Sequence, residues 1–235
     1  MTTPGFSLVN TAEAVEFNQH LTLPTQRNIL LGDPAAFAND SDVSSALTNI
    51  HGKAKQSAEI IGRLTQDQTR TTPLKHEAAS KIAASLIEAA EGTQRLLSNR
   101  ANDYVRASDE IMASRFKLNA ERHFHYDRIA DWIGREAKTE GGYAKIREAI
   151  TDDPDFALTM YNMSHRLLGL PDEHAFNFKT KIVEHWAPEA MEHIETSHKL
   201  SQLAKRYPAF TAKVNSSFYS PLELAKVRTR VELPA

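Results

Sequence analysis

Cysteine is absent from the 235 residues of this chain. Its absence excludes disulfide bonds, thiolate nucleophiles and metal centres with cysteine ligands. Three motifs of common enzymes are also missing: the G-x-S-x-G nucleophile elbow, the G-x-x-x-x-G-K-[ST] phosphate loop and the G-x-G-x-x-G dinucleotide loop. The chain has no run of about 18 uncharged apolar residues and no basic-then-apolar leader. We therefore expect a non-enzymatic protein with no cofactor and no membrane partner, located in the cytoplasm or within an assembled particle.

Proline is missing from one long stretch, Leu74 to Asp153, although the chain contains ten prolines. Because proline lacks a backbone N–H and fixes φ, it is excluded from helix interiors and favoured in a helix's first turn. The stretch predicts a very long helix. Its apolar stripe is interrupted between Asn119 and His123 and forms again from Tyr126, so we expect a bend or break there. Short helices are predicted to begin at Pro154, Pro171, Pro188 and Pro221.

Apolar residues recur at spacings of three and four from Ser41 onward, as in a coiled coil. The first stripe consists of Val43, Leu47, Ile50, Ala54, Ser57, Ile61 and Leu64. A turn at residues 66–72 separates it from a second helix that opens at Pro73. The predicted fold class is all-α: a long antiparallel, coiled-coil-like helical hairpin over residues 41–140, followed by a bundle of short helices over residues 141–226.

Both ends of the chain are predicted to be extended. Residues 1–40 hold three prolines and two glycines and show no sustained periodicity, which predicts an extended arm. In residues 227–235, apolar and charged residues alternate with the period of a β-strand; a frayed helix end is the alternative. Neither segment can build a core alone. The arm is expected to lie across the helical body or to reach a neighbouring chain, and the tail to add as a strand to a neighbour or to pair with the arm. The partner-binding candidates are Phe6, Leu8, Val9, Ile29, Leu30, Leu31, Val227, Thr229, Val231 and Leu233.

The formal net charge of −2 is divided unevenly along the chain. Residues 151–198 carry nine Asp or Glu and three Lys or Arg, whereas residues 199–235 carry two Asp or Glu and seven Lys or Arg. The acidic and basic segments either neutralise each other within one chain or pair head to tail between subunits. Nucleic acid is not an expected partner, except through the basic C-terminal region.

One group of residues has the spacing of a metal site. Glu195 and His198 are placed as in the Glu-x-x-His motif of di-iron helical bundles, and Glu189 with His193 adds a neighbouring pair. The chain has no second Glu-x-x-His motif, so the interpretation we favour for these four residues is a solvated polar face. The large aromatic residues of this region are predicted to be core anchors: Trp132, Tyr161, Phe176, Phe178 and Trp186.

These patterns favour a structural or assembly subunit of a larger, oligomeric complex, with self-association or a neighbouring subunit as the partner. A component of a phage or virus particle is the concrete form of this hypothesis, which is based on similarity of architecture alone. Two alternatives remain open. One is an all-helical adaptor or regulatory module that binds a partner helix in a groove, and the other is a metal-dependent helical-bundle enzyme that uses the Glu189–His198 face.

Overall fold

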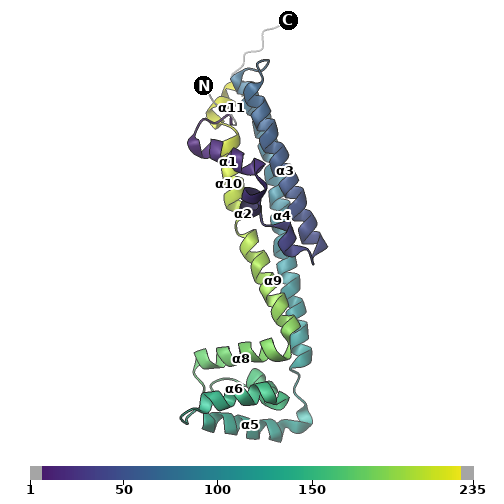
Figure 1. The fold of residues 1–235 in the computed structure, drawn as a ribbon, viewed down its shortest axis with the longest axis vertical. Coiled ribbons are helices and arrows are strands. Elements are labelled where there is room, and N and C mark those ends of the chain that lie inside the picture. Colours follow the sequence, from purple (N-terminus) through teal and green to yellow (C-terminus); the bar gives the residue numbers. More distant parts are fainter. Residues whose placement is uncertain (1–6, 229–235) are drawn as a thin grey trace. The chain divides into compact units, whose positions relative to one another are not determined.

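The computed structural model describes residues 7–228, and all regular secondary structure in that range is helical (Figure 1). The predicted all-α class is therefore confirmed for this part of the chain. The chain divides into two compact units. Unit 1 comprises residues 1–100 together with 199–235, and unit 2 comprises residues 101–198. This division differs from the segments expected from periodicity, because periodicity identifies helices without showing which of them pack together.

Unit 1 contains five α-helices of its own in its described part and a short 3-10 helix. They are α1 (Ala12–Thr22), α2 (Pro24–Leu31), η1 (Pro34–Phe37), α3 (Ser41–Gln66), α10 (Tyr207–Phe218) and α11 (Pro221–Arg228). Unit 2 contains η2 (Ala120–Arg122), α5 (His123–Glu136), α6 (Gly142–Asp152), α7 (Pro154–Asn162) and α8 (Asp172–Trp186). The helices α4 (Thr72–Arg115) and α9 (Pro188–Ala204) each contribute residues to both units.

The segment before α3 is helical, so the prediction of an extended arm over residues 1–40 is wrong. Thr11 caps α1 by accepting a hydrogen bond from the Ala14 N–H, and Pro24 occupies the first turn of α2. Helix α1 packs against α3 and α10, and the ring of Phe17 lies 5.8 Å from that of Phe210. The prolines of this segment open short helices, whereas the prediction took them as signs of an extended chain. Removing the segment would therefore expose the core of unit 1.

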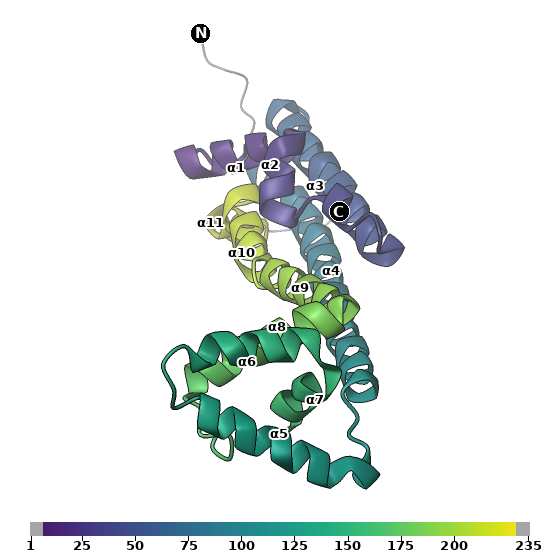
Figure 2. The same ribbon diagram turned by 60° about the horizontal axis from the view of Figure 1, so that its bottom comes forward.

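The buried side of α3 is the apolar stripe predicted from the sequence. Its members are all buried: Val43, Leu47, Ile50, Ala54, Ser57, Ile61 and Leu64. Figures 1 and 2 both show α3 beside the first part of α4. At one end, Lys75 Nζ donates to the Thr65 carbonyl oxygen at 3.2 Å. At the other end, Arg100 Nε donates to Asp40 Oδ2 at 3.0 Å, and Asp40 also caps α3 through the Val43 N–H.

Most of unit 2 follows the end of the long helix. Helix α4 stops at Arg115, and α5 begins at His123, so the predicted break is confirmed. Helices α5 to α8 surround a core that includes Ile133, Ile146 and Ile182. The prolines that were predicted to open α7 and α9 lie at the first residue of each helix.

The C-terminal helices complete unit 1. Helix α10 packs against α1 and α2, and α11 extends to residue 228. Val227 is therefore helical, which corrects the start of the predicted extended tail. Phe6, Thr229, Val231 and Leu233 lie outside the described residues, so the predicted C-terminal strand stays a prediction. Within residues 7–228, no helix combines the length and the apolar character required to cross a bilayer.

Candidate interaction surfaces

Two of the four metal candidates on α9 contact other side chains. Glu189 accepts a hydrogen bond from Arg115 Nη2 at 2.9 Å, and the ring of His193 lies 5.3 Å from that of Tyr104. The backbone N–H of Glu189 itself, followed by Arg115, lowers the pKa of the Glu189 carboxyl group. Glu195 and His198 are exposed. In the described part of the chain, no three His, Asp or Glu side chains converge in an arrangement that could hold a metal ion.

The described partner-binding candidates fall into three environments. Ile29 on α2 is 64% exposed, and its side chain is available to a partner. Leu8, Val9, Leu30 and Val227 are half-buried. Leu31 is fully buried, so its side chain belongs to the core of unit 1. The Leu31 carbonyl accepts a hydrogen bond from the hydroxyl of Tyr207 at 2.9 Å, and burial raises the pKa of that hydroxyl.

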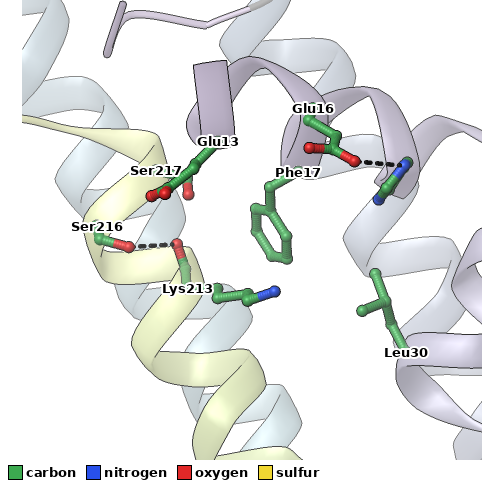
Figure 3. Close-up of a pocket in the computed structure, with 8 residues that line it drawn as sticks. Glu13, Glu16, Phe17, Leu30, Lys213, Ser216 and Ser217 are labelled. Carbon is green, nitrogen blue, oxygen red and sulfur yellow. Dashed lines mark hydrogen bonds and ion pairs between the residues drawn. The ribbon is translucent and has the colours of Figure 1, made fainter. Parts of the chain in front are cut away.

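A pocket of about 400 Å³ lies between α1, α2 and α10 in unit 1 (Figure 3). Its lining mixes apolar and charged side chains: Glu13, Glu16, Phe17, His20, Leu30 and Lys213. Glu16 lies 3.6 Å from His20 Nε2. The hydroxyl of Ser216 donates to the carbonyl of Lys213, so it is not paired with a base that could activate it as a nucleophile.

Three large apolar side chains of unit 2 are strongly exposed: Phe124 at 74%, Leu167 at 81% and Phe176 at 71%. A side-chain contact links the segments that carry the second and third. His165 Nε2 lies 2.7 Å from Asp172 Oδ1, which ties the turn containing Leu167 to the first turn of α8. Phe176 follows Asp172 by four residues, so both side chains lie on one side of α8. We call Leu167 and Phe176 the apolar pair.

Phe124 is also carried on a well-anchored segment. Arg122 donates two hydrogen bonds to the Asp155 carboxylate, at 3.0 and 2.6 Å, and His125 Nε2 lies 3.2 Å from the same group. These contacts tie the start of α5 to the start of α7. The ring of His123 lies 4.0 Å from that of Phe124. Because its backbone segment is already held, little backbone freedom is lost when a partner covers Phe124.

The aromatic residues predicted as core anchors divide into two groups. Phe178 is buried, and Trp186 packs on the core while its Nε1 donates to the Ile150 carbonyl at 2.8 Å. Phe176 is exposed, which contradicts its prediction as a core residue. Residues two apart point about 200° apart around a helix, so Phe176 and Phe178 could not both face the core. This spacing was the signal that could have identified the exposed aromatic residue.

An acidic groove lies between α4 and α9 in unit 2. It has a volume of about 690 Å³. Its lining is Ala107, Glu110, Ile111, Ser114, Arg115 and Glu189. Residues 101–115 and 188–198 together carry six Asp or Glu and two Lys or Arg, a formal net charge of −4. Within residues 7–228, the exposed carboxylates of Asp109, Glu110, Glu192 and Glu195 make no ion pair.

A basic face lies in unit 1, on the end of α9 and on α10. Residues 199–218 contain four exposed bases and no Asp or Glu: Lys199, Lys205, Arg206 and Lys213. A turn at residues 205–206 joins the two helices, with the Lys205 N–H bonded to the Ser201 carbonyl and the Arg206 N–H bonded to the Leu203 carbonyl. Tyr207 and Phe210 of α10 are buried in unit 1.

No known family, curated protein or solved structure matches this chain. The proposed function is therefore based on the chemistry of the surfaces described above.

Proposed function

We propose that this protein is a non-enzymatic assembly subunit that binds further copies of itself or a neighbouring subunit. The apolar pair and Phe124 are the observation that supports this proposal most directly. Large apolar side chains that stay more than two-thirds exposed on a unit with a packed core are available for burial against another protein. A particle of a phage or virus is one setting in which such a subunit would act.

The energetics of the apolar pair support a role in association. Complete burial of a Phe or Leu side chain contributes about 1.5–3 kcal/mol. Because Leu167 and Phe176 are already partly covered, burying the remainder of both would contribute roughly 3 kcal/mol. That amount corresponds to about a hundredfold change in a dissociation constant.

We include in this proposal a helical hairpin, a C-terminal strand and a bundle of short helices. The contacts of Lys75 with Thr65 and of Arg100 with Asp40 support an antiparallel α3–α4 hairpin as a stiff element of the subunit. A strand formed by residues 229–233 on a neighbouring chain would add a second means of association. The short helices of unit 2 would then form the bundle that presents the apolar pair.

The test is to measure mass against concentration by light scattering on a sizing column. The single chain has a mass of 26.3 kDa. We expect multiples of this mass for the natural sequence, and dissociation at about a hundredfold higher concentration for a double variant, Leu167→Ser with Phe176→Ser. Asn177→Ser, an exposed polar change on the same helix, is the matched control and should leave the mass unchanged. A natural chain that stays at 26.3 kDa at every concentration would refute self-assembly.

A helical adaptor is the second candidate, and the groove between α4 and α9 is the observation that favours it. A groove between two helices can accept the apolar side of a third. This candidate predicts a monomer that binds a helical peptide of another protein. The same mass measurement separates it from the assembly subunit.

A further inference from the structure

We infer that the acidic groove of unit 2 binds the basic face of unit 1 from a second copy of this chain. The inference rests on the proposed assembly function and identifies the two surfaces that meet. The groove would bind the segment that consists of the end of α9, the turn at residues 205–206 and α10.

The groove offers both kinds of contact that such a helix requires. Ala107 and Ile111 give it apolar lining, while Glu110 and Glu189 place carboxylates in it. Glu189 is already bonded to Arg115, whereas Glu110 is not engaged in an ion pair within residues 7–228. Two partly exposed apolar side chains, Val105 and Ile194, lie on the helices that form the groove.

The basic face provides the complementary charges. Lys199, Lys205 and Arg206 are exposed, and within the described residues their side chains form no ion pair. Lys199 lies on α9, Lys205 and Arg206 lie in the turn that follows it, and Lys213 lies on α10. Because residues 199–218 contain no Asp or Glu, these bases give the whole segment a positive charge.

Charge complementarity selects a second copy as the occupant. The two segments that form the groove have a formal net charge of −4, and residues 199–218 have a formal net charge of +4. Unit 2 as a whole carries 18 Asp or Glu and 12 Lys or Arg, whereas unit 1 carries 12 and 16. Two copies of unit 2 would therefore repel each other, while unit 2 and unit 1 attract. Every copy has one surface of each kind, so the contact repeats until a dimer or ring closes or a chain grows.

The test reverses charges on each surface and then on both. The basic variant is Lys205→Glu with Arg206→Glu, and the acidic variant changes the two carboxylates that line the groove, Glu110→Lys with Glu189→Lys. Mass and dissociation constant are measured by sedimentation at about 0.05 M and about 0.5 M salt. We expect each variant alone to weaken association by about tenfold or more, and the natural chain to weaken by a similar factor at the higher salt concentration. An equimolar mixture of the two variants should associate again, because each supplies the surface that the other has lost.

A matched control carries the same charge change elsewhere in unit 1. Lys53→Glu with Arg63→Glu on α3 should leave association unchanged, and circular dichroism should show that all variants keep their helices. If the natural chain associates but neither variant weakens it, the groove contact is refuted and the assembly function stands. If the natural chain is a monomer at both salt concentrations, the inference and the proposed function fail together. Association of the natural chain that is indifferent to salt would also overturn the groove contact.

Discussion

Lowering the pH is expected to loosen the C-terminal helices of unit 1 through one buried imidazole. His76 on α4 is 3% exposed, and its Nδ1 accepts a hydrogen bond from the backbone N–H of Ser220 at 3.0 Å. Ser220 immediately precedes α11, so this bond ties the connection between α10 and α11 to α4. An imidazole that is protonated on both nitrogens has no lone pair left for the bond. Burial lowers the pKa of His76; Glu223 opposes this effect and Lys226 adds to it.

The direction of the pH dependence follows from that lowered pKa. The unfolded chain takes up a proton on His76 near pH 6.5, while the folded chain resists protonation until a lower pH. The stabilisation is therefore complete above about pH 6.5 and is lost as the pH falls through the folded-state pKa. Breaking the bond leaves the Ser220 N–H without its acceptor, which costs about 1–3 kcal/mol. His51, whose pKa burial also lowers, adds a loss in the same direction.

Two substitutions isolate the contribution of His76. His76→Asn keeps an acceptor near the position of Nδ1 but does not titrate, whereas His76→Leu removes the acceptor at every pH. We expect urea unfolding followed by far-UV circular dichroism to show a smaller loss for the Asn variant than for the natural chain between about pH 8 and about pH 5.5. The Leu variant should be about 1–3 kcal/mol less stable than the natural chain at the higher pH.

Hydrogen exchange at a single amide tests the bond between His76 and Ser220 directly. Hydrogen exchange of the Ser220 amide, corrected for the intrinsic effect of pH, should accelerate at low pH in the natural chain and less so in the Asn variant. Both tryptophans, Trp132 and Trp186, lie in unit 2, so their fluorescence reports on the other unit. His198→Asn, a change at an exposed site, is the control. Equal losses on acidification in the natural chain and in His76→Asn would refute the role assigned to this imidazole.

Three further substitutions test packing, one in unit 2 and two in unit 1. A methyl group at Gly142 would overlap the carbonyl oxygen of Glu136, so Gly142→Ala should destabilise unit 2 by about 3 kcal/mol in urea unfolding followed by tryptophan fluorescence. Gly52→Ala, in the open interior of α3, should instead stabilise unit 1 by up to about 1 kcal/mol; a similar effect at both glycines would contradict this reasoning. Tyr207→Phe should cost unit 1 about 1–2 kcal/mol, because the Leu31 carbonyl loses its buried donor. An unchanged thermal midpoint in circular dichroism would count against that account.

Sequence analysis located correctly those helices whose apolar pattern lies in residues close together along the chain. The buried side of α3 could be predicted because a stripe with spacings of three and four is a property of neighbouring residues along one helix. The break after Arg115 was visible for the same reason, since the stripe itself is interrupted. Residues 12–31 were assigned to an extended arm because α1 and α2 are short and show no sustained apolar periodicity. Their stability comes from packing on α3 and α10, which lie far away along the chain.

The candidate surfaces were less predictable, because they depend on contacts between distant residues. The acidic and basic segments could be counted from the sequence, but not the groove, which forms because α4 and α9 come together in unit 2. Arg115 and Glu189, which join these helices, are 74 residues apart. The exposure of Phe176 had a signal in its spacing from Phe178, and the prediction did not use it. No spacing indicated that Leu167 would lie in a turn with an exposed side chain.

The division of the chain into units has a consequence for synthesis on the ribosome. Unit 2 is one continuous segment, so it can fold as soon as residues 101–198 have emerged. Unit 1 is discontinuous, since α10 supplies Tyr207 and Phe210 to a core that begins with α1. Its earlier helices must wait with apolar surface uncovered until the last part of the chain is translated. During this interval a nascent chain would contain a folded unit 2 and an incompletely folded unit 1. The exposed apolar surface of unit 1 would then be accessible to a chaperone.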